Sequence, residues 1–122
     1  MTTQRFLSND NTVTDAQTGL VWSKTTIACD VDYADAEKAV AELGEGWRLP
    51  TVDELQTILD RTKYSPAIDT DAFPDTHSDW YWTSTPCAWN DKARWVVFFG
   101  NGFVGGSRQD VSACVRAVRA SQ

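Results

Sequence analysis

The sequence of 122 residues has no excess of basic side chains and no long apolar run. Its 17 acidic and 11 basic residues give a net charge of −6, whereas binding to a phosphate backbone needs clustered Lys and Arg. Residues 1–6 lack the apolar core of a signal peptide, and no later run approaches membrane-spanning length. We therefore expect neither nucleic acid nor membrane as a partner, and a cytoplasmic or virion-associated location.

Histidine and cysteine are also scarce. His77 is the only histidine, which excludes sites that need two, such as common zinc sites. The three cysteines, Cys29, Cys87 and Cys114, cannot all pair within one chain, and they form no C-x-x-C motif. We interpret them as ordinary thiols in a reducing compartment. A nucleophilic pair of His77 with Cys29 or Cys87 stays open, but we expect no enzyme and no cofactor.

Aromatic side chains, in contrast, are abundant: the chain has six Trp, five Phe and three Tyr. Each buried aromatic removes about 150–250 Å² from water, so a compact core needs neither a metal nor a disulfide. At this length, residues 1–122 are expected to form a single domain.

Two amphipathic helices are predicted in the first half of the chain. Apolar residues recur at helical spacing between 33 and 43, after Asp32 as the N-cap and before Gly44 as the stop. A second helix is predicted over 52–60. Thr51 is its expected N-cap, and Glu54, three residues later, completes a capping box.

The remainder is predicted to be β-structure and loops. Strands are expected over 11–15, 20–22, 80–85, 94–99, 103–104 and 111–118, and residues 23–30 are expected to be a loop. The long polar segment 61–79 is expected to be held to the body by Ile68 and Phe73. Two early helices and a β-rich second half predict an α+β fold.

Five stretches occur in a characteristic order. They are N-T-V-T-D with T-G-L-V-W (11–22), G-W-R-L-P-T with E-L (46–55), Y-W-T-S-T (81–85), F-G-N-G (99–102) and V-R-A-V-R (115–119). In this order they resemble the C-terminal domain family of the Legionella collagen-like adhesin, over nearly the whole chain. The resemblance implies a C-type-lectin-like fold: two helices packed on a small twisted antiparallel sheet, with long loops on one side.

The resemblance implies a recognition module, of the kind found on bacterial adhesins that hold glycans or on phage and retroelement-diversified binding proteins. A distant branch carries the formylglycine-generating enzyme, so the fold alone does not choose a function. Related adhesin domains are trimeric, which leaves a homo-oligomer open. Exported relatives often pair cysteines at positions that correspond to Val40 and Ala117, so this bridge is expected to be absent, although Cys114 lies close by.

In this fold the late loops commonly form the contact face, here residues 80–94 and 101–108. The expected contact residues are Trp80, Tyr81, Trp89, Asn90, Arg94, Asn101, Phe103 and Arg108. The alternative is that these aromatics only cap the core. The remaining strand-like tryptophans are expected in the core: Trp22, Trp47, Trp82 and Trp95.

Two patterns are reminiscent of calcium sites. Asp69, Asp71 and Asp75 lie in the long loop, where C-type lectins bind calcium, but their spacing fits no EF-hand loop. The triplet 89–91 matches part of a lectin sugar site, but Pro86 lacks the flanking carboxylate or amide groups of the partner triplet. We interpret the first as a solvated acidic loop and the second as a coincidence, and expect no metal.

The sequence therefore favours a non-catalytic module that binds a protein partner, as a phage or mobile-element product that acts on a host protein or is displayed on a virion. The alternative is a glycan-binding adhesin module that holds sulfated or other polysaccharides, with Arg94 and Arg108 as contacts. A remote alternative is an oxidoreductase of the formylglycine-generating type.

Overall fold

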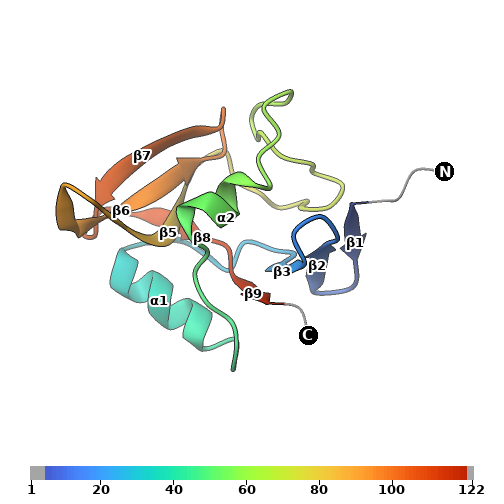
Figure 1. Ribbon diagram of the computed structural model, residues 1–122, viewed down its shortest axis with the longest axis horizontal. Helices are drawn as coiled ribbons and strands as arrows, with labels where there is room; N and C mark the ends of the chain where they lie inside the picture. Colours follow the sequence, from blue (N-terminus) through green and yellow to red (C-terminus); the bar gives the residue numbers. More distant parts are fainter. Residues whose placement is uncertain (1–4, 121–122) are drawn as a thin grey trace.

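The computed structural model describes residues 5–120, which form two helices and two sheets (Figure 1). The smaller sheet has the order β1 (Phe6–Ser8), β2 (Thr12–Asp15), β3 (Leu20–Ser23) and β9 (Val118–Ala120). The larger sheet has the order β4 (Ala28–Val31), β8 (Ala113–Val115), β5 (Trp80–Cys87), β6 (Asn90–Phe98) and β7 (Phe103–Arg108). All neighbours are antiparallel except β5 and β8.

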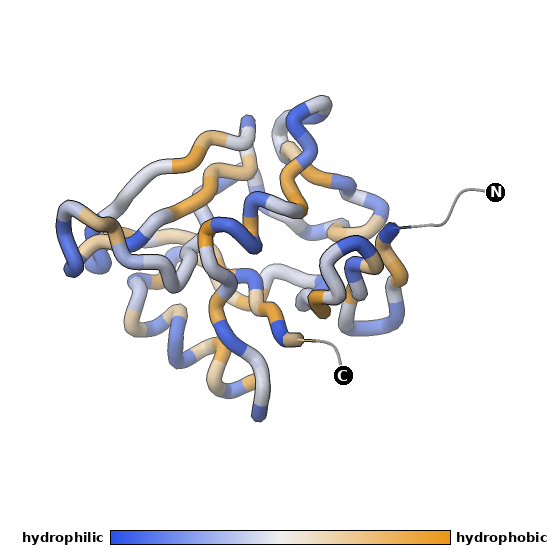
Figure 2. The backbone as a smooth tube through the Cα atoms, viewed as in Figure 1, coloured by the Kyte–Doolittle hydropathy of each residue, from blue (hydrophilic) through white to orange (hydrophobic). Residues whose placement is uncertain are grey.

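The larger sheet lies between the two helices, α1 (Tyr33–Ala41) and α2 (Val52–Gln56). Successive strand residues point to opposite faces, so one face takes Tyr81 and Val97 and the other takes Trp82 and Val96. The first face packs with Leu55 of α2, and the second with the buried side of α1. Figure 2 shows hydrophobic segments along the strands of the larger sheet. The α+β prediction is confirmed, with a second small sheet beside the main one.

Most element predictions are confirmed, with shorter helices than expected. Thr51 and Glu54 form the predicted capping box, but α2 ends at Gln56 rather than near residue 60. The segment 61–79 is irregular and is held to the body as predicted, since Ile68 and Phe73 are fully buried. In the described part of the chain, no helix is long and apolar enough to cross a membrane.

Two strand predictions are wrong. Residues 23–30, expected to be a loop, contain part of β4, whose mixed polar sequence hides its pairing with β8. Residues 111–118, expected to be one strand, divide into β8 and β9, which belong to different sheets. Arg116 lies at this division, where its buried guanidinium donates to the carbonyls of Ser23 and Lys24.

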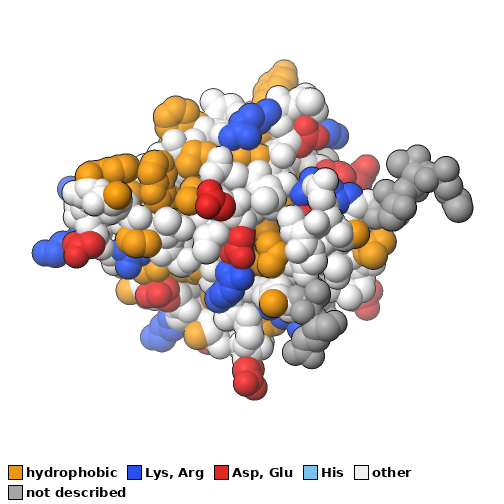
Figure 3. Space-filling model, in the orientation of Figure 1, with side chains coloured by type: hydrophobic (Ala, Val, Ile, Leu, Met, Phe, Trp, Pro, Cys, Tyr) orange, Lys and Arg blue, Asp and Glu red, His pale blue; other side chains and the backbone are white. Residues whose placement is uncertain are grey.

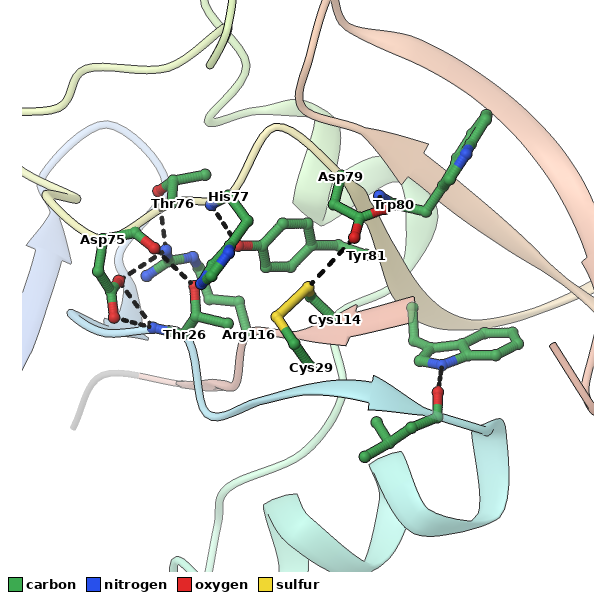
Figure 4. Close-up of a disulfide and its surroundings, with 12 residues drawn as sticks. Thr26, Cys29, Asp75, Thr76, His77, Asp79, Trp80, Tyr81, Cys114 and Arg116 are labelled. Atoms are coloured by element: carbon green, nitrogen blue, oxygen red, sulfur yellow. Dashed lines mark hydrogen bonds and ion pairs between the residues drawn. A yellow bond between two sulfur atoms is a disulfide. The ribbon is translucent and has the colours of Figure 1, made fainter. Parts of the chain in front are cut away.

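The interpretation of the cysteines as three ordinary thiols is also wrong. Cys29 of β4 and Cys114 of β8 form a disulfide, which Figure 4 shows beside Asp79 and Tyr81. Only Cys87 is free, and it is buried. The positions expected for a family bridge, Val40 and Ala117, are buried in the core cluster around α1. The chain therefore has a bridge that spacing alone did not reveal.

Candidate recognition surface

The turn between β5 and β6 places a large aromatic side chain in solvent. Cys87 pairs with Asn90, which leaves a tight turn at residues 88–89, and the side chain of Trp89 is 67% exposed. Its ring packs edge-to-face on Trp95 of β6, with 5.3 Å between ring centroids and an interplanar angle of 83°. Trp89 is therefore exposed and at the same time held in place by a neighbouring aromatic.

A glycine on β7 leaves room for this packing. Gly106 is the partner of Trp95 across the sheet. A Cβ atom there would lie 2.8 Å from Cζ2 of Trp89 and 2.9 Å from Sγ of Cys87, closer than real Cβ contacts. Because only glycine leaves this space, the edge of the Trp89 ring can approach the strand closely at Gly106, on the side of the sheet that faces α2.

We define the hairpin platform as Trp89, Trp95, Val104 and Gly106. The three strand residues lie on one face by alternation and register, and Trp89 covers that face from the turn. Trp95 and Val104 are half-buried. Figure 3 shows hydrophobic side chains gathered over the hairpin end of the larger sheet, beside α2.

A second aromatic group lies at the opposite end and on the opposite face of the same sheet. Trp80 packs on Phe98 at 5.0 Å and on Phe103 at 5.9 Å between ring centroids. Phe103 is 60% exposed, and a groove of about 320 Å³ lined by Trp80, Val96 and Val111 lies next to the group. The expected single contact face is therefore divided into two aromatic surfaces.

The other expected contact residues have varied surroundings. Tyr81 is fully buried, and its hydroxyl bonds to Thr26 and accepts from the backbone N–H of His77, so its assignment as a contact residue is wrong. Arg94 is half-buried, with its guanidinium 4.7 Å above the ring of Tyr33 on α1. Asn101 accepts from the N–H of Phe103 and shapes the β6–β7 turn.

Asn90 and Arg108, in contrast, are exposed near the platform. The Asn90 side chain accepts from the N–H of Lys92. Arg108 lies on the platform's face of β7 and pairs with Asp110 at 3.0 Å, with both side chains largely in solvent. Sequence reasoning missed Trp95 and Gly106. Trp95 was expected in the core, because a strand residue between Arg94 and Val96 gives no sign of how far the covering helix extends.

The weak metal candidates do not converge. Asp69 accepts from the N–H groups of Asp71 and Ala72 and shapes a local turn. The Asp75 carboxylate accepts from the N–H of Thr26 and lies 3.7 Å from the Arg116 guanidinium, as Figure 4 shows. Within residues 5–120, no group of three or more His, Cys, Asp or Glu side chains is placed to hold a metal ion.

A sheet held between two helices, with exposed aromatics at its hairpin end and edge, defines a small α+β domain. Residues 11–119 match the family model described as the Lcl C-terminal domain, and the chain belongs to this family. The search of curated proteins finds no match. Family membership identifies the chain as an adhesin-like module, which is compatible with non-catalytic binding.

Proposed function

We propose that this domain is a non-catalytic recognition module that binds a protein partner through the hairpin platform. The observation that carries the proposal is Trp89, which is 67% exposed although Trp95 and Gly106 hold its ring against the sheet. Tryptophan is enriched among the residues that dominate binding energy in protein interfaces. A ring that is already ordered loses little conformational entropy when a partner covers it.

The polar rim of the platform supports a protein partner over a sulfated glycan. Sulfated chains need clustered, free basic groups, whereas here Arg108 is paired with Asp110. Arg94 of β6, the other arginine proposed for such a ligand, stacks its guanidinium on the ring of Tyr33 of α1 and donates to the carbonyl of Asp91. An apolar centre with a rim of both charges is typical of protein interfaces.

The environment of the cysteines supports a binding role over an oxidoreductase. Cys87 is buried beneath Gly106 and Trp89, and a reactive thiolate needs a partly exposed, electropositive site. Cys29 and Cys114 are joined to each other. The same bridge favours an oxidising location, so we propose a cell surface or a virion as the place of action in preference to the cytoplasm.

The test is affinity capture with the wild-type chain and with Trp89→Ala, followed by titration of the purified captured protein. Loss of the aromatic is expected to weaken binding by about 2 kcal/mol, or about thirtyfold. Tyr64→Ala is the matched control, because Tyr64 is 80% exposed on the 61–79 segment, away from the platform. Equal affinity of the Trp89→Ala and Tyr64→Ala variants for the captured protein would refute binding through the hairpin platform. If wild type binds a glycan on an array and Trp89→Ala does not, the ligand of the platform is a sugar and not a protein.

A further inference from the structure

Two charged side chains border the hairpin platform at opposite ends. Asp91 lies two residues after Trp89 in β6, and strand alternation puts its carboxylate on the face that carries Trp95. Arg61 lies at the other end, where its guanidinium donates to the carbonyl of Gly102 at 3.2 Å. Both side chains are exposed, and within the described residues neither belongs to an ion pair. The platform is therefore an apolar surface between a negative and a positive group that are both available to a partner.

The charged groups on the neighbouring strands do not change this pattern. Arg108 lies on the same face of the sheet, but its guanidinium is paired with Asp110 at 3.0 Å. Lys92 alternates to the opposite face of β6, the face of α1. A partner that covers the platform is therefore complementary when it places a cation beside Asp91 and an anion beside Arg61.

The distance between the two ends suits an extended segment. From Gly102 to Arg108 the chain advances six residues, or about 20 Å in a strand, and Asp91 lies just beyond the end marked by Arg108. A polyproline II segment rises about 3.1 Å per residue, so about seven residues cover this distance.

The two tryptophan rings favour proline at the centre of such a segment. Trp89 and Trp95 meet at 83°, so the rings form a corner rather than a flat stack. Because Trp89 packs closely at Gly106, this corner exists before a partner arrives. A proline ring is compact, apolar and already fixed in φ, so it fills the corner with little loss of conformational entropy. Aromatic surfaces that bind proline-rich segments use the same property.

A free hydrogen-bond donor at the corner matches the backbone of a polyproline II segment. The buried side-chain nitrogens that lack a partner in the described chain belong to Trp22, Arg94, Arg116 and Arg119. The indole N–H of the half-buried Trp95 makes no hydrogen bond within residues 5–120 and is not one of these buried groups, so it reaches solvent. The carbonyls of polyproline II have no internal partners and can accept from it.

We infer that the protein partner contributes a proline-rich segment in the polyproline II conformation, with a basic residue beside Asp91 and an acidic residue beside Arg61. The inference rests on the proposed function and names the chemistry of the partner at the same site. The prolines fill the corner of Trp89 and Trp95, and one of their carbonyls accepts from the Trp95 indole. The two charges fix the direction in which the segment lies.

Synthetic peptides test this inference before the partner is identified. The probe is R-P-P-P-P-P-P-E, whose two charged residues lie about 22 Å apart in polyproline II. NMR titration follows the indole N–H signals of the labelled chain, assigned with Trp89→Phe and Trp95→Phe. The signals of Trp89 and Trp95 should shift and saturate. Trp89→Ala should weaken binding at least about tenfold, and the control Tyr64→Ala should not.

Reversed charges test the two ends of the platform. The peptide E-P-P-P-P-P-P-E places a like charge beside Asp91 and should bind wild type more weakly than the probe, by up to about fivefold. Asp91→Arg should reverse this order, so that the peptide with two acidic ends binds more tightly than the probe. Glu37→Arg, on the exposed side of α1, changes the net charge equally and should keep the wild-type order. Circular dichroism checks that both variants keep the fold.

The requirement for proline is tested with R-G-S-G-S-G-S-E, a flexible peptide with the same charges, which should bind at least about tenfold more weakly than the probe. Equal binding of these two peptides, shifts confined to tryptophans outside the platform, or an unchanged order of the peptides in Asp91→Arg would each overturn the inference. A captured protein that depends on Trp89, together with no binding of the proline peptide, would overturn the inference and leave the proposed function intact.

Discussion

At the scale of single residues, Arg116 has the most unusual environment in the described chain. Its side chain is fully buried, its guanidinium lies 4.9 Å above the ring of Phe73, and it donates to Thr76 at 2.9 Å. Burial lowers the pKa of Arg116 from its ordinary value, since desolvation disfavours the charged form. The residue thus joins the 61–79 segment to the end of β3, where it donates to the carbonyls of Ser23 and Lys24.

Replacement of Arg116 by Met is expected to lower the free energy of unfolding by about 1–3 kcal/mol, because the carbonyls of Ser23 and Lys24 lose their donors inside the protein. Chemical denaturation measures the loss, and amide hydrogen exchange should rise most in residues 73–77. Arg108→Met removes the same side chain from an exposed site and should change stability by less than about 0.5 kcal/mol. Equal effects of the two substitutions would contradict this role.

For single residues, local sequence patterns predicted which aromatic side chains are exposed better than which side chains are buried. Trp89 was identified from its place next to a turn, a local feature. The run Trp80-Tyr81-Trp82 alternates between the faces of a strand, but nothing local tells that α2 and the 61–79 segment cover the face of Tyr81. Arg116 lies in a motif used for the resemblance, and its burial depends on groups distant in the chain.

At the scale of elements, the capping box of α2 is the feature that the sequence predicted most fully. Thr51 accepts from the N–H of Glu54, and Glu54 accepts from the N–H of Thr51 and from Arg48. These contacts are local, so a pattern of a few residues determines them. The α-helix ends early because the N–H groups of residues 57–59 bond three residues back instead of four, and the N–H of Asp60 donates to the carbonyl of Ala67 in the following segment. No local pattern reveals that contact.

The same box predicts a pH dependence. The hydrogen bond from Arg48, the largest cause, lowers the pKa of Glu54 below its ordinary 4.5. A carboxyl whose pKa is lower in the folded state stabilises the fold above its ordinary pKa and loses this contribution as the pH falls through the folded value. Glu54→Gln is therefore expected to reduce stability at neutral pH by about 0.5–1 kcal/mol.

The difference in unfolding free energy between wild type and Glu54→Gln should shrink as the pH falls from neutral to below the ordinary glutamate value. Denaturant titrations at a series of pH values measure it. Asp53→Asn provides the comparison, since Asp53 is an exposed acidic residue in the first turn of the same helix. A difference that stays constant over the whole range would show that the Glu54 charge does not stabilise the start of α2.

At the scale of the whole molecule, the ordered set of short motifs predicted the family and the α+β fold, because those motifs mark turns and strand ends along nearly the entire chain. The candidate surface was predicted only in part. Register decides that Trp89 and Phe103 lie on opposite faces, and register depends on turns and shifts rather than on composition. The disulfide was not predicted because Cys29 and Cys114 are 85 residues apart, and only the pairing of β4 with β8 brings them together.

That bridge encloses both helices and the strands β5 to β7 in one covalent loop, so its effect belongs to the entire fold. Constraint of an unfolded chain over this separation of 85 residues contributes about 4.5 kcal/mol in the loop-entropy account. Reductant should therefore lower the unfolding free energy of wild type markedly, by up to that amount, and leave the double variant Cys29→Ala/Cys114→Ala unchanged. The free Cys87 is present in both proteins, which removes its chemistry from the comparison. Intact mass without reductant checks that wild type carries the bridge. Equal responses of the two proteins to reductant would show that the bridge does not stabilise the fold.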